Sequence, residues 1–161
     1  YNLIYEGMTR HYPRAQPLAK PGFAAGPCLF KDTAQLVAFA KNNFSLGNAS
    51  ILVNEGLVLH VIEKMREEYD LENLTVGLLG MAFKAGIDDI RSSLSYKMKK
   101  ILSLHAAKVL TTDPYVTIDP ELVPVDSMIS DSDILVLCTP HDEYRDLDLQ
   151  NKPVIDVWGY F

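Results

Sequence analysis

A cysteine and an aspartate, four residues apart, are the pair in this sequence that could do covalent chemistry. Cys28 and Asp32 lie at the end of a Gly/Pro-rich stretch and precede an apolar periodic segment. Asp32-Thr33 predicts a helix start with Asp32 as N-cap. Cys28 would then lie at or just before a helix N-terminus, where a thiolate is favoured, and a carboxylate one turn away could handle a water or a proton. The alternative is a small buried cysteine in an ordinary loop, the more common fate of a lone cysteine.

The loop that carries the cysteine is shaped by two glycines and two prolines. Gly22 and Gly26 allow backbone conformations closed to other residues. Pro21 and Pro27 fix φ and remove two backbone donors. We therefore predict a loop over residues 15–31, followed by a helix over residues 32–43.

Two cations follow a short apolar run that ends in glycine. The run over 74–80 predicts a buried strand, and the loop after it carries Lys84 and Arg91 before a helix start at Ser92-Ser93. Ligands of parallel sheets bind beyond the carboxyl ends of the strands, so this loop is a candidate pyrophosphate site. The motif G-x-G-x-x-G occurs nowhere in the chain, so the loop is not a dinucleotide fingerprint. The alternative is that Lys84 and Arg91 are solvated surface charges with no ligand.

Strands and helices must alternate to position these residues. Predicted strands over 74–80, 108–112, 134–138 and 153–158 are separated by helices over 94–105 and near 128–129. This order predicts the α/β class: a helical linker segment over 1–70, then a small Rossmann-like parallel-sheet domain over 71–161. An amphipathic helix over about 48–69 is either a spine or dimer seam, or an ordinary core helix.

The overall composition is that of a globular protein. The chain has 161 residues, of which 48% are hydrophobic and 22% charged. A net charge of −6 gives no bulk attraction to nucleic acid. Two cysteines are too few for a disulfide framework, no apolar run approaches the roughly 20 residues of a membrane span, and no signal peptide is seen. We expect a cytoplasmic protein with no nucleic-acid partner, no membrane partner and no metal site.

Read together, these motifs resemble the UDP-glucose/GDP-mannose dehydrogenase family. The stretch G-x-x-x-G-x-C-L-x-K-D over 22–32 is similar to the family's active-site loop, and F-K-x-x-x-D-D-x-R-x-S over 83–93 to its carboxyl-terminal motif. Asp113-Pro114, then Ser132-Asp133 to Thr139-Pro140-His141, then Asp156-Val157-Trp158 follow in the family's order. The ordered set covers essentially the whole chain and is far more specific than any one motif.

The resemblance implies an NAD-dependent nucleotide-sugar 6-dehydrogenase, which oxidises the sugar C6 alcohol to a carboxylate in two hydride transfers. Cys28 matches the nucleophile that adds to the C6 aldehyde and then holds the acid as a thioester. Asp32 matches the residue that positions or activates the hydrolytic water. Cys138, inside a predicted strand, is expected to be structural.

The resemblance also implies contacts to substrate and cofactor. Lys84 matches a residue that contacts the UDP- or GDP-sugar, and Arg91 matches one that reaches the NAD side. Gly22 and Gly26 belong to the substrate-binding loop. Arg14 corresponds, with loose spacing, to an arginine donated across the dimer, and we expect a homodimer through the helix over 48–69.

The sequence also departs from the family. The N-terminal NAD-binding domain and a Lys-x-x-x-Asn pair that precedes this region are absent, and the first residue is Tyr1 rather than Met, so we expect a fragment that is inactive alone. Pro27 stands where many members carry His or Tyr, which leaves the sugar and the base open. The alternative function is a non-catalytic nucleotide- or sugar-binding α/β module, and Cys28 with Asp32 favours the dehydrogenase.

Overall fold

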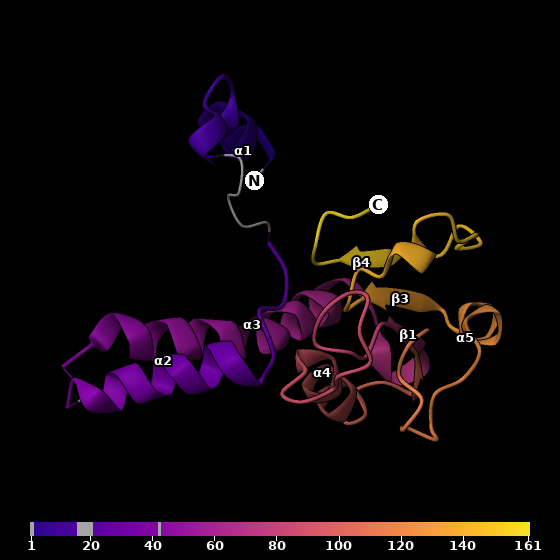
Figure 1. Cartoon of the computed structure of the whole chain (residues 1–161). Helices are drawn as coiled ribbons and strands as arrows, with labels where there is room; N and C mark the ends of the chain where they lie inside the picture. The colour runs from indigo at the N-terminus through magenta and orange to yellow at the C-terminus, as the bar shows by residue number, and fades with distance from the viewer. Residues whose placement is uncertain (1, 16–20, 42) are drawn as a thin grey trace.

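A parallel sheet organises the carboxyl-terminal half of the chain (Figure 1). The computed structural model describes residues 2–15, 21–41 and 43–161. Within them, β1 (Thr75–Leu79), β2 (Lys108–Thr112), β3 (Ile134–Leu137) and β4 (Val154–Asp156) form one sheet in the order β2-β1-β3-β4. Every neighbouring pair is parallel. The predicted α/β class and Rossmann-like arrangement are therefore confirmed.

The two faces of the sheet are covered by different helices. Successive side chains of a strand point to opposite faces. Val76 and Leu78 of β1 belong to a core shared with α3 (Ser45–Glu68) and α4 (Leu94–Leu102). Leu79 belongs to a second core shared with α5 (Val125–Asp131) and the short 3-10 helix η3 (Asp142–Tyr144). Gly77 lets α5 approach closely, since a Cβ there would lie 2.2 Å from the sulfur of Met128.

The helical half of the chain consists of α1 (Asn2–Thr9), the 3-10 turns η1 (Pro13–Ala15) and η2 (Leu71–Asn73), α2 (Pro27–Phe39) and α3. Figure 1 shows α2 lying alongside α3, with both extending away from the sheet. Val58, Val61, Ile62 and Met65 in the carboxyl-terminal half of α3 are buried in the domain core. The predicted long helix is thus confirmed, and it begins three residues earlier than expected.

The predicted start of the helix after the cysteine loop is wrong. α2 begins at Pro27, with Gly26 as its N-cap, and not at Asp32. Proline is favoured at the first helical position because its missing N–H would have no intrahelical partner there and its φ is already helical. Gly26 supplies the positive φ of 100° that this entry into the helix requires. Cys28 consequently lies within the first turn of α2.

Helix α3 meets the criterion for a membrane span by length and composition alone. Its most apolar 18-residue window has a mean hydropathy of 1.2, and 22% of that window is buried within the protein. The core helix of a soluble protein can meet the same criterion. The buried residues of α3 pack with α4 and the sheet in the domain core, whereas Leu46, Leu52 and Val53 of the same helix are exposed.

Candidate active site

The thiol of Cys28 is exposed at the second position of α2. The first N–H groups of a helix lack intrahelical partners, and the dipole places partial positive charge at this end. The 13-residue helix therefore presents an environment that stabilises negative charge next to the thiol.

Two glycines hold the cysteine loop against aromatic rings. A Cβ on Gly22 would lie 2.1 Å from the ring of Trp158, and one on Gly26 would lie 2.7 Å from the ring of Phe83. Both glycines also have positive φ, so any other residue would be strained there. The N–H of Gly26 donates to the carbonyl of Ser92 at 3.5 Å, which ties the loop to the segment before α4. These contacts give both glycines a packing role, and their predicted contact with substrate stays a prediction.

Cys28 and Lys84 line the same cavity, which has a volume of about 360 Å³. Lys84 is exposed, and within the described ranges no hydrogen bond or ion pair engages its ammonium group. The walls are mostly apolar and come from the cysteine loop, the loop after β1 and the ends of β3 and β4. The lining residues are Phe23, Ala24, Ala25, Gly26, Pro27, Cys28, Leu29, Phe83, Lys84, Ala85, Pro140 and Trp158.

Arg91 lies just before α4 and is held by a carboxylate. Its Nε and Nη2 atoms donate to Asp89 at 2.7–3.0 Å. These hydrogen bonds raise the pKa of Arg91 and lower that of Asp89. A thiolate at Cys28 would also raise the pKa of Arg91, by less than Asp89 does, so the two side chains lie within electrostatic range of each other.

Four of the predicted site residues are not among those that line this cavity: Gly22, Arg91, Asp32 and Arg14. Asp32 follows Cys28 by one helical turn, is exposed, and has its Oδ1 atom 3.3 Å from the Nζ atom of Lys31. Such an exposed pair holds its carboxylate weakly. Arg14 lies in η1, is exposed, and is not among the cavity's lining residues. The structure therefore brings Cys28 and Lys84 together and does not bring Asp32 or Arg14 into the same cavity.

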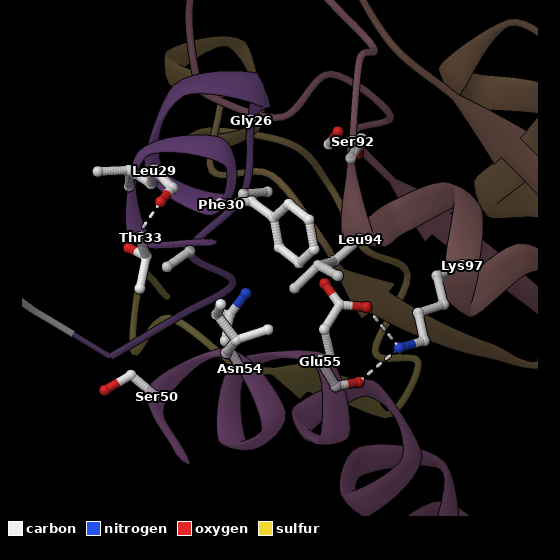
Figure 2. A pocket seen from close by; sticks show the side chains of 14 residues that line it. Gly26, Leu29, Phe30, Thr33, Ser50, Asn54, Glu55, Ser92, Leu94 and Lys97 are labelled. Carbon is white, nitrogen blue, oxygen red and sulfur yellow. Dashed lines mark hydrogen bonds and ion pairs between the residues drawn. The ribbon is translucent and has the colours of Figure 1, made fainter. Parts of the chain in front are cut away.

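A second cavity of about 400 Å³ lies between α2, α3 and the start of α4 (Figure 2). In this view the ring of Phe30 lies close to Leu94. The Nζ atom of Lys97 donates to the backbone carbonyl of Glu55 at 2.7 Å and to its carboxylate at 2.8 Å, which joins α4 to α3. Residues 24–26 and Leu29 line both cavities, so the cysteine loop and the first turn of α2 form a wall between them.

A buried polar cluster underlies the loop that carries Lys84. The side chains of Asp113 and His141 are both inaccessible to solvent and lie 3.1 Å apart (Oδ2 to Nε2). Burial alone raises the pKa of Asp113, but hydrogen bonds from His141 and from backbone N–H groups outweigh it and lower that pKa to about 2. Thr139 donates to the carbonyl of Ala82 at 2.6 Å.

The profile of the UDP-glucose/GDP-mannose dehydrogenase family, UDP binding domain, matches residues 77–161, just over half of the chain. The chain belongs to this family. It is 33% identical to the UDP-glucose 6-dehydrogenase AglM of Haloferax volcanii over 81% of this chain and 34% of that protein. It is 28% identical to the UDP-N-acetyl-D-mannosamine dehydrogenase of Pyrococcus horikoshii over 95% of this chain and 40% of that protein.

The fold of the whole chain is also that of a family member. A UDP-glucose dehydrogenase structure from Pyrobaculum islandicum superposes with a TM-score of 0.83 and 23% identity, over 97% of this chain and 39% of that one. The chain thus spans well under half the length of these relatives. The match takes in both the helical half and the sheet domain, as the resemblance of the motifs predicts.

Sequence reasoning missed the roles of Asp113, Thr139 and His141. It treated them as strand stops and as members of the family's ordered motifs. A usable signal was present: Asp113 directly follows β2, and Thr139 and His141 come just after β3, on the carboxyl side of the sheet where the loop after β1 also begins. Among the residues that the structure describes, no three His, Cys, Asp or Glu side chains gather as a metal-binding group.

Proposed function

We propose that this chain is the nucleotide-sugar-binding and cysteine-bearing part of an NAD-dependent nucleotide-sugar 6-dehydrogenase. The observation that carries the proposal is that Cys28 and Lys84 line one cavity. Its volume of about 360 Å³ is within the usual range for small-molecule sites. A nucleophile and an unpaired cation at the two sides of an apolar cavity suit a ligand with a phosphate at one end and a reacting carbon at the other.

Lys84 would bind the pyrophosphate of a UDP- or GDP-sugar. Its ammonium group has no partner within the described ranges, so a phosphate would meet a charge that is not already neutralised. Phe23, Phe83 and Trp158 provide the apolar surface that a base or sugar ring would cover.

Cys28 would then act on the sugar's C6 atom. Its thiolate adds to the C6 aldehyde to form a thiohemiacetal, and loss of a hydride and a proton from that carbon and its hydroxyl gives a thioester. Water attacks the thioester carbonyl, and the C–S bond breaks to release the carboxylate and the thiol. Asp32, one turn from Cys28 and exposed, would accept a proton from that water after turning away from Lys31.

NAD would supply the hydride acceptor in both oxidations. Arg91 is the residue here that fits a cofactor phosphate: it is exposed, and its Nη1 atom makes no hydrogen bond within the described ranges while Nε and Nη2 are held by Asp89. The remaining cofactor contacts must come from outside this chain, which lacks a dinucleotide fingerprint. By itself the chain should therefore bind nucleotide sugar weakly and reduce no NAD.

We also propose that the protein is a homodimer that pairs through α3. Leu46, Leu52 and Val53 on this helix are 69–75% exposed, and Phe39 at the end of α2 is 87% exposed. Such an apolar surface is larger than scattered single residues and suits a two-fold interface. The cytoplasmic location expected from the composition stays a prediction.

Calorimetric titration with UDP-glucose, UDP-N-acetylmannosamine and GDP-mannose tests the binding. We expect Lys84→Met to weaken binding by about tenfold or more, as for loss of a charge-assisted contact. Lys100→Met is the matched control, because Lys100 is an exposed lysine in the last turn of α4, outside the cavity lining. Binding that survives Lys84→Met unchanged would refute the assignment.

Alkylation of Cys28 separates the enzyme from the non-catalytic module. A bound nucleotide sugar should slow the reaction of Cys28 with iodoacetamide, because both occupy one cavity. Tight binding with no protection of Cys28 would favour the non-catalytic alternative, and no binding of any of the three ligands would refute both.

A further inference from the structure

We propose that Asp113 and His141 form a buried positioning pair that fixes the conformation of the loop after β1 and thereby places Lys84. The inference rests on the proposed function, since it concerns how the nucleotide-sugar contact is held. Neither residue lines the cavity that Cys28 and Lys84 share. Their effect on a ligand would therefore pass through the loop.

The loop is anchored on both sides of Lys84 at the same distance in sequence. Two residues before it, the N–H of Ala82 donates to Oδ2 of Asp113 at 2.9 Å, as does the N–H of Met81 at 2.7 Å. Two residues after it, the N–H of Gly86 donates to Nδ1 of His141 at 3.1 Å. The stretch between the two anchors holds the lysine whose ammonium group is otherwise unpartnered.

The hydrogen bonds define the state of the imidazole. Because the Gly86 N–H donates to Nδ1, that nitrogen carries no proton, and Nε2 is the nitrogen that donates to Asp113. The carboxylate in turn uses Oδ1 to accept from the N–H groups of Tyr115 and Val116, at 2.8 and 3.0 Å. Asp113 thus joins the end of β2, the loop after β1 and the segment after β3.

The pair is built as a support and not as a surface feature. Both side chains are fully buried. The ring of His141 lies against those of Tyr115 and Tyr144, with centroids 5.1 and 5.5 Å away. Tyr160 donates to the backbone carbonyl of His141 at 3.0 Å, which holds the segment after β3 in place. A buried carboxylate and imidazole joined by hydrogen bonds have few alternative arrangements, so they can hold a loop in one conformation.

The test combines a double-mutant cycle with hydrogen exchange. His141→Phe removes both anchoring bonds of the imidazole, and Asp113→Asn places an amide N–H₂ where only acceptors fit. We expect each to weaken UDP-sugar binding about tenfold and to speed amide exchange across residues 81–92. In the Lys84→Met background, His141→Phe should weaken binding by no more than about threefold further, since coupled residues are not additive. A purely structural role would not produce this coupling.

Two further variants keep the test decisive. His141→Asn keeps an acceptor near the position of Nδ1 and should recover part of the affinity lost in His141→Phe. Ser132→Ala removes another buried hydrogen bond, from Ser132 Oγ to the Met128 carbonyl at 2.7 Å, and should lower stability without changing affinity or loop exchange. Two outcomes would overturn the inference: amide exchange that is unchanged in both Asp113→Asn and His141→Phe, or losses of affinity that multiply when His141→Phe is combined with Lys84→Met. In either case, binding by the wild-type chain would still uphold the proposed function. If the wild-type chain binds no nucleotide sugar, the proposed function fails and this role for the pair fails with it.

Discussion

The most direct physical test of this structure is the effect of Asp113→Asn on stability as a function of pH. Hydrogen bonds lower the pKa of Asp113 to about 2 in the folded protein. An unfolded aspartate has a pKa of about 3.9, and one pKa unit corresponds to about 1.4 kcal/mol. Ionised Asp113 therefore contributes about 2.5 kcal/mol to the free energy of unfolding at neutral pH.

The sign of the pH dependence follows from the direction of this shift. Because the pKa of Asp113 is lower in the folded state, its contribution is fully present above the unfolded pKa of about 3.9 and is lost as the pH falls to about 2. Asparagine cannot make this contribution at any pH. The amide N–H₂ of the asparagine also points either at the N–H groups of Ala82 and Met81 or at those of Tyr115 and Val116. Either orientation leaves buried donors unsatisfied, which lowers the free energy of unfolding by about a further 1–3 kcal/mol.

Guanidinium unfolding followed through Trp158, the single tryptophan, measures this difference. We expect Asp113→Asn to lower the free energy of unfolding by about 3.5–5.5 kcal/mol at pH 7. The difference in stability from wild type should narrow by about 2 kcal/mol between pH 5 and pH 2. Asp88→Asn is the control, because Asp88 is exposed in the same loop and should show neither effect. A gap that stays constant over this pH range would refute the argument from the buried carboxylate.

Two further predictions concern the cysteines and the assembly. Cys28 should react with iodoacetamide at least about a hundred times faster than Cys138, because Cys28 is exposed whereas burial raises the pKa of Cys138 to about 12. Mass spectrometry of the labelled peptides measures the two rates, and equal labelling would contradict the prediction. Light scattering should show a dimer, and Leu52→Glu should dissociate it. The control is Leu104→Glu, at a similarly exposed leucine outside α3, which should leave the dimer intact. A wild-type monomer at all concentrations would contradict the proposed pairing.

The strands were predictable because each is a short apolar run with a clear stop. Gly80, Asp113-Pro114 and Thr139-Pro140 end the first three runs, and the observed strands end one or two residues before these signals. A parallel sheet covered on both faces needs such continuous apolar runs. The apolar runs and the turn residues between them were together sufficient to predict the fold class. The predicted helix start at Ser92-Ser93 also agrees with the structure, in which α4 begins directly after Ser93.

The start of α2 and the Asp113 cluster were not predictable by the same reasoning. The loop predicted over 15–31 includes Pro27 because proline fixes φ and lacks a backbone donor, but at the first position of a helix the same properties favour it. Asp113 contacts Met81 and His141 across 32 and 28 residues of sequence. Local patterns contain no information on such pairings, and an Asp-Pro dipeptide is equally well explained as a turn.

The placement of the cysteine depends on aromatic rings that come from distant parts of the chain. Trp158 follows β4 and Phe83 follows β1, and each ring occupies the space that a side chain on Gly22 or Gly26 would need. The indole of Trp158 is itself fixed, since its Nε1 atom donates to the carbonyl of Cys138 at 3.0 Å at the end of β3. The cysteine loop therefore lies at the carboxyl edge of the sheet against two rings, one from the segment after β1 and one from the segment after β4. Because the loop after β1 is anchored at that same edge by Asp113 and His141, the distance between Cys28 and Lys84 is set by the sheet and not by either loop alone.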